Sequence, residues 1–345
     1  MKPFARPTRA MVLAAGLGNR MKPLSTLIPK PALPVLNRPI IAHLLEHLAS
    51  HGVTRVVVNL HHRPEEMEQA VTRHLPAGLD VTFSREGTIL GTAGGLKKAG
   101  RHFREGAFYL VNSDSLTGAD LTAAATDHAA SGRAATLITM RHDPLSGYRA
   151  IGVAQGGVAQ GGVAPGGSAT ARVTAIGGRR WGGGESEPRT FTGVHVLEPR
   201  VLEEIPSGVA CDINTDVYPW LLDQDEDAVG AWRHDGWWFE AGGPARYLEL
   251  NLEMLARTGR DAVVGPGFFI DEEASVTRSV IGAGARLARG SVVEDSVIWD
   301  NVTVGEGVAL RRCIVTSGVQ VPLTSLARTI VIQDPGGLPR MEPLS

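Results

Sequence analysis

The chain has 345 residues, of which 43% are hydrophobic and 20% charged. This composition supports packed cores and excludes global disorder, and the length suits two domains. A formal net charge of −2 gives no electrostatic reason to expect nucleic acid or an anionic membrane as a partner. No apolar run approaches the ~20 residues of a membrane span. Cys211 and Cys313 stand far apart, outside metal-like spacing, so we expect reduced thiols in a cytoplasmic protein.

The N-terminal part predicts a parallel βαβ unit. Residues 10–14 read as a buried strand, and residues 53–60 are β-branched and apolar, which predicts a second strand. Between them, residues 38–51 predict a helix, because apolar side chains recur at helical spacing and Gly52 stands at the cap position. A strand, helix and strand in this order favour a right-handed crossover.

A third strand is predicted at residues 107–111, and it runs directly into Asn112-Ser113-Asp114. A carboxylate therefore follows the carboxyl end of a strand. In open α/β sheets, this edge is where ligands bind. Asp114 is accordingly a candidate metal ligand, because carboxylate oxygens are what Mg²⁺ prefers.

Residues 152–187 form a glycine-rich insertion in this region. Three related pentapeptides run in tandem from Val153 to Gly167. Glycine at this density loses much backbone entropy on ordering, which favours a mobile, expanded hairpin loop. A functional lid over the substrate is the alternative.

The C-terminal part carries a repeat of 17 residues. Val264, Ile281, Ile298 and Val315 are equally spaced, and further aliphatic residues stand five or six positions apart between them. This periodicity predicts a β-solenoid over residues 262–330, with three coils of three short faces each. A sequential β-meander is the alternative. Residues 331–345 are rich in Pro and Gly and predict a loose tail.

The segment after the first strand contains small residues and two possible phosphate-binding cations. It reads Leu13-Ala-Ala-Gly-Leu-Gly-Asn-Arg20, followed by Pro29-Lys30-Pro31. Glycines let backbone N–H groups approach a polyphosphate closely. The segment is neither a Walker A motif, since no Gly-Lys-Ser/Thr follows, nor the dinucleotide fingerprint, since the third glycine is missing. An ordinary glycine turn with two solvated cations remains the alternative for this segment taken alone.

Taken together, these motifs resemble those of the sugar nucleotidyltransferases, the NDP-sugar pyrophosphorylases. The resemblance covers most of the chain. It rests on the Gly-x-Gly-x-Arg-Met and Pro-Lys-Pro segments, Glu86 with Leu90-Gly-Thr-Ala-Gly94, Asn112-Ser-Asp114, Phe191-Thr-Gly-Val-His195, and Gly236 to Pro244 with Tyr247-Leu-x-x-Asn251. The C-terminal repeat resembles the left-handed β-helix of the mannose-1-phosphate guanylyltransferase and glucose-1-phosphate adenylyltransferase branches.

The resemblance implies a fold and a reaction. The fold is a Rossmann-like α/β/α catalytic domain over residues 8–258, followed by a left-handed parallel β-helix over residues 262–330. The reaction joins a nucleoside triphosphate to a sugar 1-phosphate with Mg²⁺ and releases pyrophosphate. GTP with mannose 1-phosphate is the first expectation, and UTP, dTTP, ATP with glucose 1-phosphate, or a heptose phosphate stay open.

The resemblance also implies the roles of particular residues. Arg20 would hold the leaving pyrophosphate, Lys30 would bridge the α-phosphate and the sugar phosphate, and Asp114 would bind the metal with Glu240. The expected nucleotide-binding residues are Leu13, Ala14, Ala15, Gly16, Gly18, Asn19, Glu86, Gly91 and Thr92, and the expected sugar-binding residues are Gly152, Thr192 and Gly193.

Two positions depart from the family pattern. Glu240 stands where the family usually has aspartate, and the usual Glu-Lys-Pro is missing, so that Arg179 either replaces its lysine or is a solvated charge. These departures leave a non-catalytic, nucleotide-sugar-sensing regulatory subunit as the alternative function. An acyltransferase in the β-helix is a weaker one, because no histidine follows His234.

The β-helix is expected to assemble the enzyme and to carry no chemistry. A short solenoid leaves open ends and flat faces, which another subunit can cover. We therefore expect a homo-oligomer through the β-helix, with Phe268, Phe269 and Trp299 as candidate contact residues.

Overall fold

The computed structural model describes residues 6–154, 170–321, 324–334 and 336–344. The chain divides into two compact units. The first contains residues up to Gly16 and His43–Trp238, and the second contains Leu17–Ala42 and Phe239–Ser345. These units divide the chain differently from the domains expected at residues 8–258 and 262–330, so those boundaries stay a prediction. Among the described residues, no helix is long and apolar enough to cross a membrane.

The first unit is built on a ten-stranded mixed sheet. Its strand order is β11-β10-β13-β8-β12-β6-β1-β4-β5, and β9 pairs with β10 and β12. The strands are β1 (Arg9–Leu13), β4 (Arg55–Leu60), β5 (Asp80–Arg85), β6 (Phe108–Asn112), β8 (Ala135–Arg141), β9 (Ile151–Ala154), β10 (Thr170–Ile176), β11 (Arg179–Arg180), β12 (Ser186–Leu197) and β13 (Val229–Arg233); a short β7 (Ser115–Thr117) follows β6.

The predicted parallel arrangement of the first strands is confirmed. β1 pairs in parallel with both β4 and β6. The helix α2 (Ile40–Ser50) is shorter than predicted, because Arg38–Pro39 form a strand, β3, that pairs with β2 (Pro34–Val35). The carboxyl ends of β1, β4 and β6 therefore lie at one edge of the sheet, and Asn112 to Asp114 follow there.

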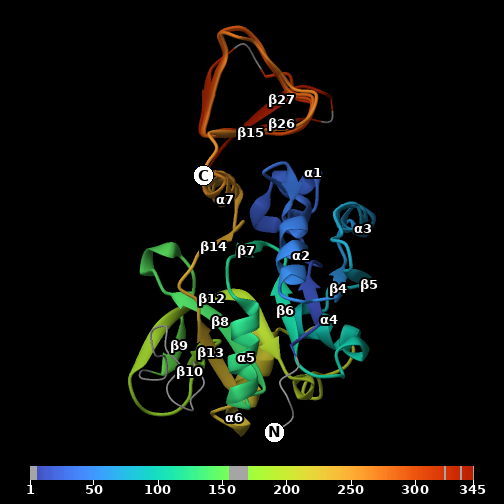
Figure 1. The fold of residues 1–345 in the computed structure, drawn as a ribbon, viewed down its shortest axis with the longest axis vertical. Coiled ribbons are helices and arrows are strands. Elements are labelled where there is room, and N and C mark those ends of the chain that lie inside the picture. Colours follow the sequence, from blue (N-terminus) through green and yellow to red (C-terminus); the bar gives the residue numbers. More distant parts are fainter. Residues whose placement is uncertain (1–5, 155–169, 322–323, 335, 345) are drawn as a thin grey trace. The chain divides into compact units, whose positions relative to one another are not determined.

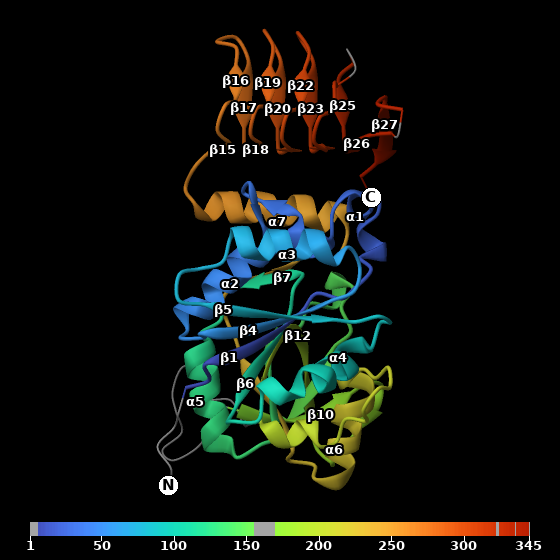
Figure 2. The ribbon, with the colours of Figure 1, turned by 90° about the vertical axis from the view of Figure 1, so that its right-hand side faces the viewer.

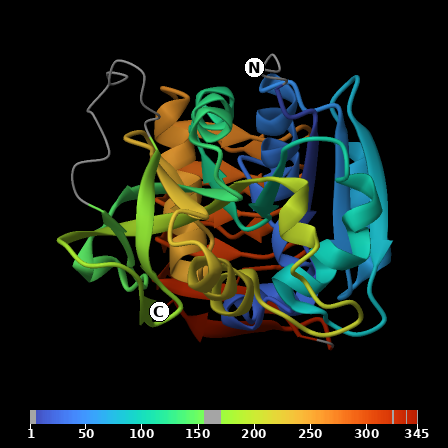
Figure 3. The same ribbon diagram turned by 90° about the horizontal axis from the view of Figure 1, so that it is seen from below.

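Helices cover both faces of this sheet (Figure 3). Phe108 and Leu110 of β6 belong to one buried cluster with residues of α4 (Gly91–Ala99) and α6 (Tyr218–Gln224). Tyr109, which points to the opposite face, donates from its hydroxyl to the Leu121 carbonyl of α5 (Leu121–Ser131) at 2.8 Å. Successive side chains of β6 thus pack on helices at opposite faces of the sheet, which is the expected α/β/α layering. The remaining helix, α3 (Pro64–Arg73), lies between β4 and β5 in the chain.

The tandem repeats of the glycine-rich insertion lie almost entirely outside the described residues. The tandem pentapeptides at 153–167 fall almost entirely within residues 155–169, so the expected mobile loop and the alternative lid stay predictions. On either side, β9 and β10 pair antiparallel, with Val153 opposite Val173. This pairing is the one expected of a hairpin.

The second unit contains a parallel β-helix. Its coils appear end-on in Figure 1 and from the side in Figure 2. The register advances by 17 residues in Ala262↔Ser279, Val280↔Val297 and Val297↔Ile314, and by 16 in the last step, Ile314↔Ile330. The strands are β15 (Ala262–Val264), β16 (Phe269–Ile270), β17 (Ser275–Thr277), β18 (Ser279–Ile281), β19 (Arg286–Leu287), β20 (Val292–Glu294), β21 (Val297–Ile298), β22 (Thr303–Val304), β23 (Ala309–Arg311), β24 (Ile314–Val315), β25 (Leu326–Ala327) and β26 (Thr329–Gln333).

The aliphatic residues of the repeat fill the core of the coils, as predicted. Those of the second and third coils are fully buried: Ile281, Leu287, Val293, Ile298, Val304 and Leu310. Val264, in the first coil, is 40% exposed. A buried aliphatic ladder of this kind stabilises the solenoid mainly through the apolar area it removes from water.

The C-terminal tail is not loose, which corrects the sequence-based expectation. β26 pairs antiparallel with β27 (Pro339–Pro343), with Val331 opposite Met341. β26 itself continues the sheet of β15, β18, β21 and β24. The tail therefore covers an edge of the solenoid that was expected to be left open.

Trp299 is the second correction. It was expected as a contact between subunits, but it is 5% exposed and donates from Nε1 to the Tyr247 hydroxyl at 3.1 Å. Tyr247 lies on α7 (Pro244–Arg257), which belongs to the same unit. Phe268 and Phe269 are exposed, as a contact role requires.

Two histidines, the buried His195 and the partly buried His47, make stability depend on pH. Burial lowers the pKa of His195 to about 3, and burial together with His51 lowers that of His47 to about 4. Between these values and about 6.5, the unfolded chain binds more protons than the folded one. We therefore expect the free energy of unfolding to be flat above pH 6.5 and to fall by about 2 kcal/mol per histidine by pH 5. Urea unfolding at pH 7.5, 6.5 and 5 measures this, and equal stability at all three would contradict it.

Candidate functional site

The end of β1 in the first unit is held by a buried polar network. Asn59 Oδ1 accepts from the Ala14 amide at 2.8 Å, and Asn59 Nδ2 donates to Glu86 Oε1 at 2.8 Å. Glu86 Oε2 accepts from the Leu90 amide at 3.0 Å. Both Glu86 oxygens thus accept hydrogen bonds from the protein, and the carboxylate holds the loop at Leu90 to Asn59 at the end of β4. Asn59 was not predicted, although its place at the end of β4 was a signal.

The start of α4 is occupied by a neighbouring segment of the chain. Ala93 and Gly94 donate their amides to the Cys211 carbonyl at 3.0 and 3.2 Å. The Thr92 hydroxyl donates to Asp212 Oδ2 at 3.0 Å and accepts from the Ile213 amide at 2.8 Å. Thr92, expected at the nucleotide, therefore anchors residues 211–213 in this structure.

Gly91 is required by the same contact. Its φ is +73°, and an added Cβ would lie 2.5 Å from the Cys211 carbonyl oxygen. Gly78 has a similar φ of +80° and open space around it. We expect Gly78→Ala to cost about 1–2 kcal/mol from backbone strain alone. Gly91→Ala should cost about 2 kcal/mol more, because backbone must also move. Urea unfolding of both variants measures the difference, and equal costs would contradict the close approach.

Asp114 lies in a turn that is fixed to the end of β1. Ser113 donates from its amide and its hydroxyl to the Leu13 carbonyl, at 3.3 and 2.5 Å. Gly193, with φ +83°, borders the same turn, because a Cβ there would lie 2.7 Å from Asn112 Nδ2. The structure thus brings the Asn112–Asp114 turn, Leu13 and Gly193 together at the carboxyl edge of the sheet.

The other two expected sugar contacts are engaged in the sheet. The Thr192 hydroxyl donates to the Ile138 carbonyl at 2.8 Å, and Thr192 is 1% exposed. Gly152 is buried in β9, where a Cβ would lie 2.5 Å from Ser186 Oγ. Both residues pack between neighbouring strands, and the Thr192 hydroxyl is already engaged, so a sugar contact through that hydroxyl is not supported.

The second unit holds the glycine segment and both predicted cations. Gly18 has φ +64°, and its carbonyl accepts from Ser25 Oγ at 2.8 Å and from the Met21 amide at 2.9 Å. A Cβ on Gly18 would lie 3.4 Å from that of Lys30, which begins the short helix η2 (Lys30–Ala32). Lys30 therefore packs directly against the glycine turn.

Backbone amides in this turn are available to a ligand. Within the described part of the chain, the amides of residues 17–20, which include Gly18 and Asn19, donate to no protein acceptor. Asn19 opens the short helix η1 (Asn19–Met21) and is exposed. In the first unit, Ala15 is buried and Gly16 is exposed with open space where a side chain would be. Unpaired N–H groups at such a turn bind anions well.

Arg20 and Glu240 meet in the second unit. Arg20 Nη2 lies 3.4 Å from Glu240 Oε1, and the Arg20 side chain is 74% exposed. Glu240 ends β14 (Trp238–Glu240), and Gly243 just after it lies against the Arg20 carbonyl. This ion pair is weak because the Arg20 guanidinium is largely in solvent. A bound phosphate could therefore replace Glu240 as the partner of Arg20.

The carboxylates suit a magnesium ion held jointly with substrate. Among the described residues, no group of three or more His, Cys, Asp or Glu side chains is arranged to hold a metal. Mg²⁺ commonly binds through one or two carboxylates and fills its remaining positions with phosphate oxygens and water. Asp114 in the first unit and Glu240 in the second unit each carry the hard carboxylate oxygens that Mg²⁺ prefers, so each suits such a site by its own chemistry.

Arg179 forms an ion pair within the first unit. It donates to both Asp223 oxygens at 2.7 and 2.9 Å, and its guanidinium lies 5.2 Å from the centre of the Trp181 ring. Trp181 donates to the same carboxylate at 2.8 Å. Arg179 is therefore not a free solvated charge; it joins β11 to α6.

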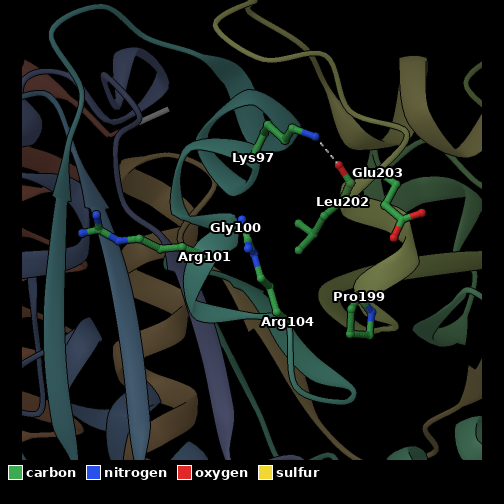
Figure 4. A pocket seen from close by; sticks show the side chains of 7 residues that line it. All are labelled: Lys97, Gly100, Arg101, Arg104, Pro199, Leu202 and Glu203. Atoms are coloured by element: carbon green, nitrogen blue, oxygen red, sulfur yellow. Dashed lines mark hydrogen bonds between the residues drawn. The ribbon is translucent and has the colours of Figure 1, made fainter.

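A cavity of about 420 Å³ lies elsewhere in the first unit (Figure 4). Lys97 donates to the Leu202 carbonyl at 2.6 Å, and Arg101 extends away from Leu202 and Glu203. The lining residues are Lys97, Gly100, Arg101, Arg104, Pro199, Leu202 and Glu203. Since these charged groups do not converge on one point, the cavity is not a candidate for the site.

Two family models match the chain. The model described as nucleotidyl transferase matches residues 9–257, and the one described as GlmU-like, C-terminal hexapeptide, matches residues 244–326. A UTP–glucose-1-phosphate uridylyltransferase of Synechocystis is 29% identical, over 94% of this chain and 93% of that protein. A mannose-1-phosphate guanylyltransferase of Mycobacterium tuberculosis is 26% identical, over 88% of this chain and 83% of that protein.

The fold also matches a solved structure. HddC from Yersinia pseudotuberculosis, in a crystal structure with GMP-PN, superposes with a TM-score of 0.54 at 20% identity. The match covers 72% of this chain and 99% of that one. At this identity, the match supports the fold alone.

Proposed function

The chain belongs to the nucleotidyl transferase family, and on this premise we propose that it joins GTP to mannose 1-phosphate and releases pyrophosphate. It is a sugar-1-phosphate nucleotidyltransferase; the base and the sugar are the proposal. The observation that carries the reaction at this site is the cluster of Gly18, Lys30, Arg20 and Glu240, with unpaired amides in the same turn.

The proposed mechanism needs positioning and positive charge more than acid or base catalysis. A phosphate oxygen of the sugar phosphate attacks the α-phosphorus in line, and the bond to pyrophosphate breaks. The phosphate is already a nucleophile, so no covalent intermediate on the protein is required.

Each residue has a defined task in this mechanism. The amides of residues 17–20 and Arg20 bind the leaving pyrophosphate, and Lys30 holds the α-phosphate and the sugar phosphate together. Asp114 and Glu240 would hold Mg²⁺, which when bound neutralises charge on the phosphates. Glu240 is one methylene longer than the family's aspartate.

GTP and mannose 1-phosphate are proposed because several relatives carry that activity in their names. These include proteins from Mycobacterium tuberculosis, Arabidopsis thaliana and Pichia angusta. UTP with glucose 1-phosphate is the second candidate, because the Synechocystis uridylyltransferase aligns over 94% of this chain. The buried Glu86 does not decide between the bases, because its carboxylate can accept from the N–H groups of either base.

A matrix of substrates tests the pair. Five nucleoside triphosphates are combined with mannose, glucose and heptose 1-phosphates in the presence of Mg²⁺, and pyrophosphate release is measured. The proposal predicts the highest kcat/KM for GTP with mannose 1-phosphate. A maximum for UTP with glucose 1-phosphate would replace it with the second candidate. Binding of nucleotide sugars without turnover of any pair would favour the regulatory subunit.

The assembly of subunits through the β-helix stays a prediction. Phe268 and Phe269 are exposed on the first coil, where another subunit could cover them. Light scattering at micromolar concentration decides between an oligomer and a monomer.

A further inference from the structure

We propose that Tyr247 and Trp299 are positioning residues, through which the β-helix holds the segment that carries Lys30. The inference rests on the proposed function, in which Lys30 binds the reacting phosphates. All the residues involved belong to the second unit. The β-helix would then contribute to catalysis through the Lys30 segment, in addition to any role in assembly.

A chain of buried hydrogen bonds joins the β-helix to this segment. Trp299, on the third coil, donates from Nε1 to the Tyr247 hydroxyl at 3.1 Å. The Tyr247 hydroxyl in turn donates to the Pro34 carbonyl. Tyr247 is fully buried, and burial raises its pKa, so the hydroxyl keeps its proton and remains a donor. The Trp299–Tyr247 bond is buried and the Tyr247–Pro34 bond is partly buried, so water competes little for either link.

Three further contacts hold the same segment. Asn251, also fully buried on α7, accepts from the Leu36 amide at 3.1 Å and donates to the Pro34 carbonyl at 3.4 Å. Asn37 Nδ2 donates to the Ile281 carbonyl of the β-helix at 2.7 Å. Residues 34–37 are thus bonded both to α7 and directly to a coil.

The connection from Pro34 to Lys30 is short and stiff. The Leu33 amide donates to the Lys30 carbonyl at 3.1 Å, and the Ala32 amide donates to the Pro29 carbonyl at 2.8 Å. Prolines at 29, 31 and 34 restrict φ along the segment. A displacement at Pro34 is therefore transmitted to Lys30 instead of being absorbed by intervening torsions.

Tyr247→Phe tests the chain in the full-length protein, because it removes the hydroxyl and keeps the ring. We expect KM for the sugar 1-phosphate to rise and kcat to fall, each about 10-fold, with KM for the triphosphate within twofold of wild type. Trp299→Phe should show the same pattern with a smaller effect. A purely structural loss would instead lower the active fraction and leave both KM values unchanged.

Tyr109→Phe is the matched control. Tyr109 is also fully buried and also donates from its hydroxyl to a backbone carbonyl, but it lies in the first unit. It should leave KM for the sugar 1-phosphate unchanged. An equal rise in that KM for Tyr109→Phe, or none for Tyr247→Phe, would overturn the positioning role.

Amide hydrogen exchange separates this inference from the proposed function. Tyr247→Phe should speed exchange of the Ala32, Leu33 and Leu36 amides at least about 10-fold, whereas Tyr109→Phe should not. Unchanged exchange in Tyr247→Phe would refute the link, whatever the activity. Faster exchange in a protein that turns over no substrate pair would support the link and refute the proposed function.

Discussion

Asp114→Ala is expected to abolish turnover in a protein that remains folded. The carboxylate follows β6 in a turn fixed to Leu13, so its place does not depend on ligand. It is half-exposed, so its removal opens no buried cavity. Losing a metal ligand should remove several kcal/mol of stabilisation of transition-state charge, which is a loss of about 1,000-fold or more in kcat. Pyrophosphate release measures the loss, and circular dichroism checks the fold.

Asp80→Ala is the matched control, because Asp80 begins β5 at the opposite edge of the sheet from Asp114. This variant should keep wild-type kcat. Asp114→Glu should retain part of the activity at raised Mg²⁺ concentration, since a carboxylate remains. Near-normal turnover by a folded Asp114→Ala protein would refute the metal assignment.

Lys30→Ala is expected to have the second-largest effect, lowering kcat by about 100-fold or more and raising KM for the sugar 1-phosphate. Lys30 packs on Gly18, beside the unpaired amides, and the prolines on either side limit the freedom it loses on binding. Lys30→Arg should not restore activity, because a planar guanidinium cannot replace a compact charge between two phosphates. Steady-state kinetics with each substrate varied in turn measures both effects.

Lys98→Ala serves as the control for loss of one positive charge, since Lys98 donates to the Arg85 carbonyl in the first unit. It should leave both KM values unchanged. If Lys30→Ala keeps wild-type kcat/KM, the phosphates bind elsewhere.

The parts of the fold that were predictable are those with a local period or a local motif. The parallel strands β1 and β4 follow from continuous apolar runs, and the 17-residue coils follow from the repeated spacing of aliphatic residues. Arg20, Lys30 and Asp114 were recognisable because their motifs are continuous in sequence. The structure places each of them in a turn next to a strand end or a glycine.

The missed features depend on contacts between residues far apart in sequence. Asn59 gains its role from Ala14 and Glu86, and Gly91 and Thr92 are engaged by residues 211–213. Trp299 was expected to be an exposed contact because the 17-residue repeat places it on a coil. Its side chain instead bonds to the Tyr247 hydroxyl on α7. Pro and Gly in the tail suggested irregular chain, whereas β26 offers β27 a strand to pair with.

The most direct test of the central claim follows the oxygen atoms of the reaction. Mannose 1-phosphate labelled with ¹⁸O in its phosphate is incubated with GTP, Mg²⁺ and the full-length protein, and the products are examined by ³¹P NMR and mass spectrometry. In-line transfer of the nucleotidyl group predicts one pyrophosphate per nucleotide sugar, with ¹⁸O in the bridge of the nucleotide sugar and none in the pyrophosphate. Label in the released pyrophosphate, or release of orthophosphate in its place, would contradict the account.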